Sequence, residues 1–327
     1  MSRYRPWGKL AWLLPKVERT SWNLVGCLGT EDRSLEVYRR LKKDLLTAKL
    51  LKILDEDFEY SVETKKIIEG RVSEVARLAG NGISDIVEDH RLLETHYEIL
   101  SPLESYISDK RDVVLDVSSL PKRFFFPMLK TLIRSPHIQN LIVTYTVPKA
   151  YTQCKLSRNL MPWAHLPLFS GGEDSAGKET KALVIAVGFD PMGIPQELSL
   201  DGHGVPIELL FPFPAPLSSV RRSWEFVQNI EKGRRQERGI NLHRVEAKNP
   251  SDAFDRLCAL LDPGREKIEL APFGPKPVSV AMCIFATLTE SEVFYTQPKS
   301  YALDYSSGIS EVFAYAVKLD GRSFYSL

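Results

Sequence analysis

Short apolar runs alternate with amphipathic segments along most of the chain. The run 22–29 is β-prone and ends in glycine, which predicts a buried strand. Behind it, apolar residues recur at helical spacing through 32–46, and again through 61–78. The same patterns predict strands at 50–54, 112–117 and 140–146 and helices at 91–107 and 121–133. Strands that alternate with helices indicate crossover units and a mostly parallel sheet, so we expect an α/β fold.

The pattern changes after residue 147, where proline, serine and glycine predict a connection, and we place the linker at 156–180. Beyond it, strands are expected at 182–187, 207–211, 241–245, 267–270 and 292–295 and helices at 218–231, 251–261 and 277–288. Strand segments 312–318 and 322–325 flank Asp320-Gly321, a dipeptide typical of hairpin turns. We therefore expect a first Rossmann-like half with an N-terminal extension in 1–155. A second Rossmann-like half, with a C-terminal β-hairpin, is expected in 181–327.

The two halves contain a repeated motif. Residues 145–151 have the sequence Tyr-Thr-Val-Pro-Lys-Ala-Tyr, and residues 295–301 have Tyr-Thr-Gln-Pro-Lys-Ser-Tyr, with five of seven positions identical. Upstream of each copy, a predicted strand leads to a Pro-Lys pair, 121–122 or 275–276, and then to an apolar helix. We infer a tandem duplication of one Rossmann-like half. Two halves paired about a pseudo-two-fold axis would turn their carboxyl sheet edges toward one cleft, where we expect the ligand.

Composition and charge exclude several classes of protein. Hydrophobic residues make up 43% and charged residues 26% of the chain, as in folded globular proteins. The 43 basic and 42 acidic residues give a net charge of +1, so the chain lacks the strong footprint of a nucleic-acid binder. No apolar stretch reaches the roughly 20 residues that span a bilayer, so we expect no membrane partner and a cytoplasmic protein.

Three further patterns add no site. The four cysteines lie far apart, without zinc-type spacing, which predicts reduced thiols. His90 and Glu94 are four residues apart on a predicted helix, which favours a surface face over a metal site. Residues 172–178 satisfy G-x-x-x-x-G-K, but no strand precedes them and a strand follows, so we reject a phosphate loop there. We predict no metal and no cofactor.

The segment after the first predicted strand is a candidate anion site. Thr30, Arg33 and Ser34 follow Gly29 at the point where backbone N–H groups and a helix dipole can hold a phosphate. Arginine and hydroxyl side chains would add donors. The alternative is a glycine turn and a capped helix whose charges face water, because no G-x-G-x-x-G fingerprint is present.

A second candidate site follows the strand predicted at 112–117. Ser118, Ser119 and Lys122 offer two hydroxyls and a cation, which suit a phosphate or a carboxylate. Asp116 lies in an apolar strand, where a carboxylate must find partners or take up a proton, so it would orient Lys122 or act as a base. Asp116 and Lys122 are the catalytic candidates. The alternative is a structural aspartate and a solvated lysine. The imperfectly matching positions of the second half are Gly274 and Lys276.

The repeated motif supplies aromatic rings beside ammonium groups, which can stack a base and screen its phosphate. These residues are Tyr145, Lys149 and Tyr151 in the first copy and Tyr295, Lys299 and Tyr301 in the second. The alternative is a packing motif that ends a strand. Residues 305–308, Tyr-Ser-Ser-Gly, follow the second copy and would form either a loop that covers a ligand or a turn before the hairpin.

Two fused Rossmann-like halves that lack a dinucleotide fingerprint and present Ser, Lys and Tyr at their strand ends resemble the CARF and SAVED class of sensors. The resemblance is architectural and covers roughly residues 20–327. It implies a nucleotide or cyclic oligonucleotide ligand, bound across a central cleft in bacterial antiviral defence.

Three functions therefore remain open. The first is a nucleotide-sensing or recognition subunit of a defence system, without catalysis of its own, that acts with a separate effector protein. The second is an enzyme that processes a nucleotide or phosphate ester with Asp116 and Lys122. The third is a structural subunit of a multiprotein complex, in which the tyrosine-rich edges contact other proteins.

Overall fold

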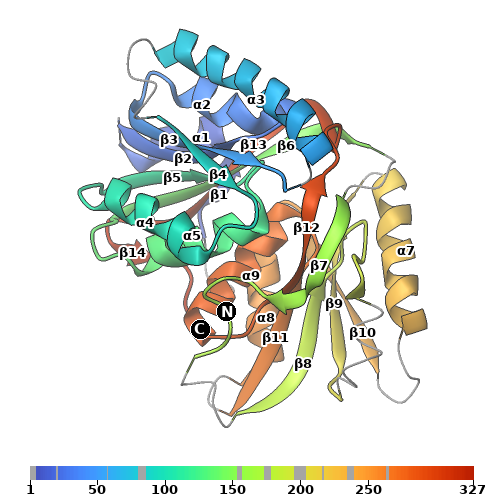
Figure 1. Ribbon diagram of the computed structural model, residues 1–327. Coiled ribbons are helices and arrows are strands. Elements are labelled where there is room, and N and C mark those ends of the chain that lie inside the picture. The colour runs from blue at the N-terminus through green and yellow to red at the C-terminus, as the bar shows by residue number, and fades with distance from the viewer. Residues whose placement is uncertain are drawn as a thin grey trace. The chain divides into compact units, whose positions relative to one another are not determined.

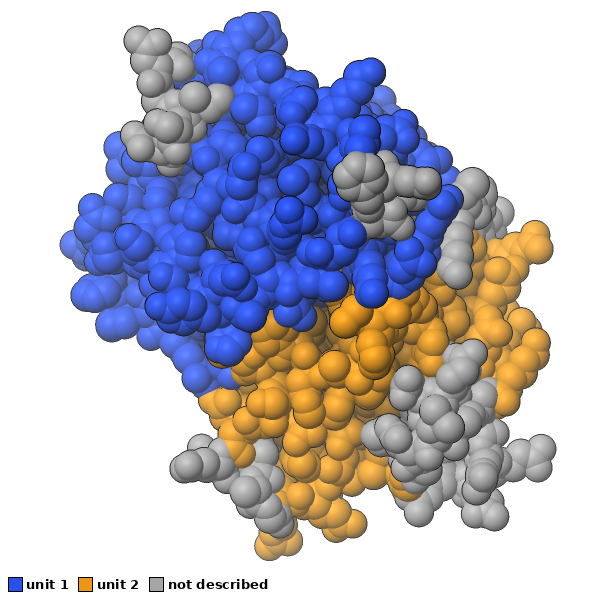
Figure 2. All heavy atoms as spheres, in the orientation of Figure 1, with its two compact units in different colours: residues 1, 3–159, 298–325 blue, residues 2, 160–297, 326–327 orange. Residues whose placement is uncertain are grey.

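The computed structural model divides into two compact units (Figure 2), and each contains one of the two larger sheets. Unit 1 comprises Arg3–Asn159 and Pro298–Tyr325, and unit 2 comprises Leu160–Gln297 and Ser326–Leu327. The structure describes residues 5–19, 21–56, 58–79, 86–152, 157–172, 178–194, 204–215, 217–233, 239–262 and 265–327.

Unit 1 contains a sheet whose central strands are parallel. In chain order they are β2 (Trp22–Leu28), β3 (Leu45–Leu54), β4 (Val87–Arg91), β5 (Asp112–Asp116) and β6 (Asn140–Tyr151). They lie in the order β4-β3-β2-β5-β6. Antiparallel β13 (Ser306–Leu319) extends the sheet beyond β6, followed by β1 (Trp7–Lys9), and β14 (Arg322–Ser323) pairs with β13.

Helices cover both faces of this sheet. On one side lie α2 (Glu36–Leu41) and α3 (Phe58–Ala79), and on the other α4 (His96–Ile107) and α5 (Lys122–Arg134) (Figure 1). Because both faces are covered, every residue of β2 is buried, as expected for a central parallel strand. Helix α4 begins with a capping box between Thr95 and Glu98. The short helix α1 (Leu10–Leu13) follows β1.

Unit 2 repeats the arrangement with fewer strands. Its sheet consists of β8 (Glu179–Ala186), β9 (Ile207–Phe213), β10 (Ile240–Glu246) and β11 (Glu266–Pro272), all parallel, in the order β10-β9-β8-β11. Its helices are α7 (Leu217–Gly233), α8 (Pro250–Leu260) and α9 (Lys276–Thr289) (Figure 1). Strands β7 (Ser157–His165) and β12 (Phe294–Tyr301) form a separate pair.

The strand orders agree with the inferred duplication. Counted along the chain, the parallel strands of unit 1 lie in the order third, second, first, fourth, fifth, and those of unit 2 in the order third, second, first, fourth. Val293, just before β12, makes a parallel bridge to Leu270 of β11, which is the fifth position. This is the Rossmann order, so the predicted α/β class with two tandem Rossmann-like halves is confirmed.

The tail of the chain lies elsewhere than expected. The predicted hairpin exists, with Lys318 opposite Ser323 and positive φ at Asp320 and Gly321, as a type I′ turn requires. However, β13 pairs with β6 and therefore belongs to unit 1, whereas we had placed it in the second half. The sequence around β13 does not determine its partner, because two paired strands can lie far apart in the chain. The expected linker also contains strand β7.

The local sequence pattern also predicted the wrong start for the helix near residue 91 and the wrong element for His90. The helix expected over 91–107 is shorter, because β4 runs to Arg91 and the capping box starts α4 at His96. His90 consequently lies on a strand, where it is buried and its Nδ1 is 2.6 Å from Glu94 Oε2.

No helix within the described ranges is both long and apolar enough to cross a bilayer. Cys154, residues 173–177 of the rejected phosphate loop and residues 195–203 lie outside the described residues.

Candidate functional site

The first and fourth parallel strands of each unit lie side by side, and in unit 1 the helices that follow them, α2 and α5, cover opposite faces of the sheet (Figure 1). In unit 1 these strands are β2 and β5, and in unit 2 they are β8 and β11. Such a switch point is where open α/β sheets bind ligands, outside the carboxyl ends of the strands. In unit 1 the two flanking segments are 29–35 and 117–122, which contain six of the predicted site residues.

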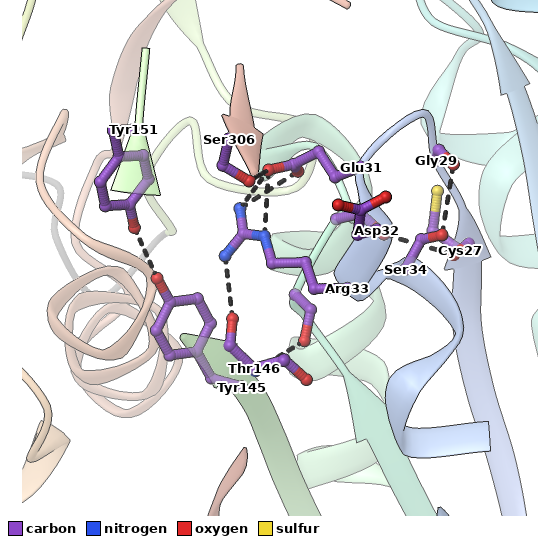
Figure 3. A network of polar contacts seen from close by, with 12 residues as sticks. Cys27, Gly29, Glu31, Asp32, Arg33, Ser34, Tyr145, Thr146, Tyr151 and Ser306 are labelled. Atoms are coloured by element: carbon purple, nitrogen blue, oxygen red, sulfur yellow. Dashed lines mark hydrogen bonds and ion pairs between the residues drawn. The ribbon is translucent and has the colours of Figure 1, made fainter. Parts of the chain in front are cut away.

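The two segments of unit 1 contact each other closely at Gly29. A Cβ on Gly29 would lie 3.0 Å from the Cβ of Ser119, so a larger residue would push the segments apart. Ser119 Oγ donates to the carbonyl of Cys27 at 3.3 Å, and Ser34 Oγ donates to the carbonyl of Gly29 at 3.2 Å (Figure 3). These two predicted ligand groups therefore tie the loop together. Among the described residues, none forms a hydrogen bond with the half-buried Thr30 side chain.

Lys122 is the first residue of α5. The preceding Pro121 makes no side-chain cap bond, and the helix begins just after β5, at the carboxyl edge of the sheet. Burial lowers the pKa of Lys122 to about 8. An anion that bound there would restore the charge of the ammonium group and would meet the positive end of the helix dipole.

Asp116, the last residue of β5, is almost fully buried. Its Oδ1 accepts from the N–H and the hydroxyl of Ser118 and from Thr144 Oγ1, the last at 3.3 Å. Burial raises the pKa of Asp116 to about 6, although the bonds from Ser118 and Thr144 and the charge of Arg33 oppose the shift. The carboxyl group is therefore a proton acceptor near neutral pH, held in one orientation by its neighbours.

This raised pKa predicts a pH dependence of stability. The folded state binds the proton more tightly than the unfolded chain, so the stabilising effect is full below pH 3.8 and is lost as pH rises through about 6. The shift corresponds to roughly 3 kcal/mol. Asp116→Asn keeps an acceptor for Ser118 without titrating, so we expect the variant to be more stable than wild type at pH 7 by up to that amount. Urea unfolding from pH 4 to pH 7 measures this, and parallel profiles for the two proteins would contradict it.

Arg33 lies in a polar network beside the switch point (Figure 3). Its Nε and Nη2 donate to the Glu31 carboxylate at 3.0 and 3.1 Å, and its Nη1 donates to the carbonyl of Thr146 at 3.0 Å. The guanidinium lies over the ring of Tyr145, 5.5 Å from its centre. Burial alone would lower the pKa of Arg33, but Glu31 and the neighbouring tyrosines outweigh it, so the group stays charged. Arg33, expected to bind an anion, is 3% exposed and engaged inside the protein.

Two predicted tyrosines complete this network. The hydroxyls of Tyr145 and Tyr151 are 2.8 Å apart, and Tyr305 packs edge-on against Tyr151. Burial raises the pKa of Tyr151 well above its ordinary value, so its hydroxyl stays neutral. The start of β13 closes the network, where Ser306 donates to Glu31.

The Glu31–Ser306 contact was not predicted. The sequence gives Glu31 no role beyond the alternative of a helix start whose charges face water, and Ser306 lies 275 residues away in the chain. The only signal was the Tyr-Ser-Ser-Gly segment at 305–308, whose Gly308 N–H donates to Asp32 Oδ2 at 3.1 Å. Residues 306–308 are thus the first residues of β13, bound to the loop after β2, rather than a separate turn or covering loop.

The remaining motif residues do not join this network. Lys149 and Lys299 are exposed on their strands, and the carbonyl of Lys299 accepts from the N–H of Glu56. Tyr295 is buried against Phe273 in unit 2, with ring centres 5.1 Å apart. The half-buried Tyr301 belongs to unit 1. The two copies of the motif therefore have different surroundings.

The switch point of unit 2 is packed more tightly than that of unit 1. A Cβ on Gly188, which follows β8, would lie 2.2 Å from the carbonyl oxygen of Phe273. A Cβ on Gly274 would lie 3.0 Å from that of Ala186. Lys276 starts α9 after an extended Pro275, as Lys122 starts α5 after Pro121. Backbone thus fills the space that the side chain of Ser119 lines in unit 1.

Comparisons with known proteins assign the chain to no family. No protein-family model matches the chain, and no curated protein matches it. Among solved structures, it is similar to the cytoplasmic domain of a prokaryotic cation chloride cotransporter, at 11% identity over 87% of this chain and 98% of that one, with a TM-score of 0.24.

Two other solved structures are similar to the same degree. One is a universal stress protein from Archaeoglobus fulgidus, at 11% identity over 84% of this chain and 96% of that one, with a TM-score of 0.23. The other is a functionally unknown protein from Pseudomonas aeruginosa, at 12% identity over 85% and 92%, with a TM-score of 0.24. At TM-scores this low, the likenesses assign no function, and the resemblance to CARF and SAVED sensors stays a prediction.

Proposed function

We propose that the chain is a nucleotide-binding sensor that holds the phosphate of its ligand at the switch point of unit 1. The observation that carries the proposal is Lys122, which begins a 13-residue helix at the carboxyl edge of the sheet. Its pKa is lowered by burial, so a bound phosphate would stabilise its charge. The helix dipole and the hydroxyl of Thr30 support the same ligand.

Sensing is favoured over catalysis by how the neighbouring groups are used. Oδ1 of Asp116 is held by Ser118 and Thr144, and Arg33 is held by Glu31. Groups engaged in this way keep a loop in one conformation, and a ligand that displaces the loop changes a surface that an effector protein can recognise. We propose such a partner, which should co-purify with the chain when nucleotide is present.

The raised pKa of Asp116 favours one alternative, an enzyme that acts on a nucleotide or phosphate ester. A carboxyl group with a pKa of about 6 suits a general base near neutral pH. Phosphate release from ATP measures this directly. Turnover by wild type that Asp116→Asn abolishes would favour the enzyme, and turnover that is unchanged would exclude Asp116 as its base.

Calorimetric titration with ATP tests the proposed site. We expect wild type to bind ATP and Lys122→Ala to bind it at least about tenfold more weakly, because a charge-assisted contact is lost. Lys66→Ala, which removes an exposed lysine of α3, is the matched control and should leave the affinity unchanged. Equal affinities for wild type and Lys122→Ala would contradict the site.

The affinity should also depend on pH. Lys122 is charged below its pKa of about 8, and a nucleotide phosphate is already ionised above pH 7. Raising the pH from 7 to 9 should therefore weaken ATP binding by about tenfold, since the protonated fraction of the free protein falls by that factor. The same titrations of Lys122→Ala should show no such slope. A wild-type affinity that is flat over this range would count against Lys122.

A further inference from the structure

Thr146 has a buried hydroxyl that makes no hydrogen bond to any residue described in the structure. Its backbone is engaged on both sides, because the N–H donates to Ser118 Oγ at 2.8 Å and the carbonyl accepts from Arg33. Its side chain is fully buried, and among the described residues no hydrogen bond reaches Oγ1. Leaving a buried hydroxyl unpaired destabilises a fold, whereas valine would fill the same strand position without that cost.

Asp116 lies on the same side of the sheet. The register of β5 and β6 sets Asp116 opposite Thr144, whose hydroxyl reaches Oδ1. Thr146 is two residues further along β6, so its side chain leaves the same face, one step closer to the carboxyl edge. Ser118 links the two groups, since its Oγ donates to Asp116 and accepts from Thr146. In the described part of the chain, no donor reaches Oδ2 of Asp116.

The second copy of the motif repeats the unpaired hydroxyl. Thr296 occupies the position of Thr146, is also buried, and its Oγ1 likewise has no partner within the described residues. The copies differ at the next position, where Val147 is replaced by Gln297. The unpaired hydroxyl is thus common to both copies of the motif.

We propose that Thr146 and Asp116 form a subsite that binds a ribose hydroxyl of the nucleotide in unit 1. This inference rests on the proposed function. Oδ2 of Asp116 only accepts, while the threonine hydroxyl donates and accepts. A ligand hydroxyl can donate to Asp116 and accept from Thr146, so both unpaired oxygens are satisfied at once. A ligand amine would leave the threonine hydrogen unpaired, and a carbonyl oxygen would leave Asp116 without a donor.

Titrations with ATP, 2′-deoxy-ATP and 3′-deoxy-ATP test the subsite. Wild type should bind ATP about tenfold more tightly than one of the two deoxy analogues, because the lost hydroxyl leaves buried groups unpaired. Thr146→Val should bind ATP and that analogue equally. Thr296→Val is the control for the same substitution at the matching position and should retain the discrimination. A thermal midpoint for Thr146→Val at or above that of wild type would show that its fold is intact.

The outcomes separate the subsite from the proposed function. Equal wild-type affinities for the three nucleotides, or discrimination that survives in Thr146→Val, would overturn the subsite and assign Thr146 to a buried water only. Dependence on Lys122 would then still stand. Failure of wild type to bind any of the three nucleotides would overturn the proposed function and the subsite together.

Discussion

Replacing Arg33 by methionine should lower the free energy of unfolding of unit 1 by about 3–5 kcal/mol, as is typical when one partner of a buried ion pair is removed. Arg33 is 3% exposed and donates twice to Glu31 and once to Thr146. Methionine has a similar length without the charge, so among the described side chains the Glu31 carboxylate would keep only its contact with Ser306. The loop after β2 would thereby lose its connection to β6.

Arg40→Met is the matched control. Arg40 forms an exposed pair with Glu36, 2.8 Å from Nε to Oε1, and such pairs contribute at most about 0.5 kcal/mol. Hydrogen exchange in urea, resolved to peptides of β2 and β6, reports the stability of unit 1 separately from that of unit 2. Equal protection in the two variants would mean that Arg33 does not hold the loop.

Gly188→Ala should destabilise unit 2 by about 3 kcal/mol, the upper end of the usual cost of overpacking. The new methyl group would lie 2.2 Å from the carbonyl oxygen of Phe273 and 3.0 Å from its carbonyl carbon. This backbone cannot yield easily, because the Phe273 N–H donates to Ala271 and its ring packs against Trp163 and Tyr295. The strands β8 and β11 would have to separate.

Gly70→Ala is the corresponding control in unit 1. Gly70 lies in α3, and apart from the backbone of its own helix no atom of the described residues lies within 4 Å of the place a Cβ would occupy. Alanine favours the helix over glycine by about 0.8–1.0 kcal/mol, so the variant should be slightly more stable than wild type. Amide exchange of β11 and α9 reports on Gly188→Ala. Unchanged protection there would show that the switch point of unit 2 is open enough to accept a side chain.

Local patterns predicted the parts of the fold that depend on local chemistry. Buried strands such as 22–28 are continuous apolar runs, and the Pro-Lys pairs mark the starts of α5 and α9. Because carboxyl strand ends meet at one sheet edge, the same patterns predicted Thr30, Ser119 and Lys122 at that edge. These predictions needed only periodicity, turn residues and the topology of crossover units.

Long-range pairing could not be predicted in this way. Strand β13 joins β6 across more than half the chain, and no local property of 312–318 distinguishes this sheet from the nearer one. Arg33 likewise appeared free to bind an anion, because Glu31 and Ser306 surround it only after β13 is in place. The sequence therefore predicted which residues gather at the edge more reliably than which of them stay available to a ligand.

Photo-crosslinking with 8-azido-ATP, followed by peptide mapping, tests most directly whether unit 1 binds a nucleotide at its switch point. We expect labelled peptides from 29–35 or 117–123, labelling that excess ATP prevents, and loss of labelling in Lys122→Ala. Labelling confined to other segments, or labelling that Lys122→Ala does not reduce, would contradict the proposed site.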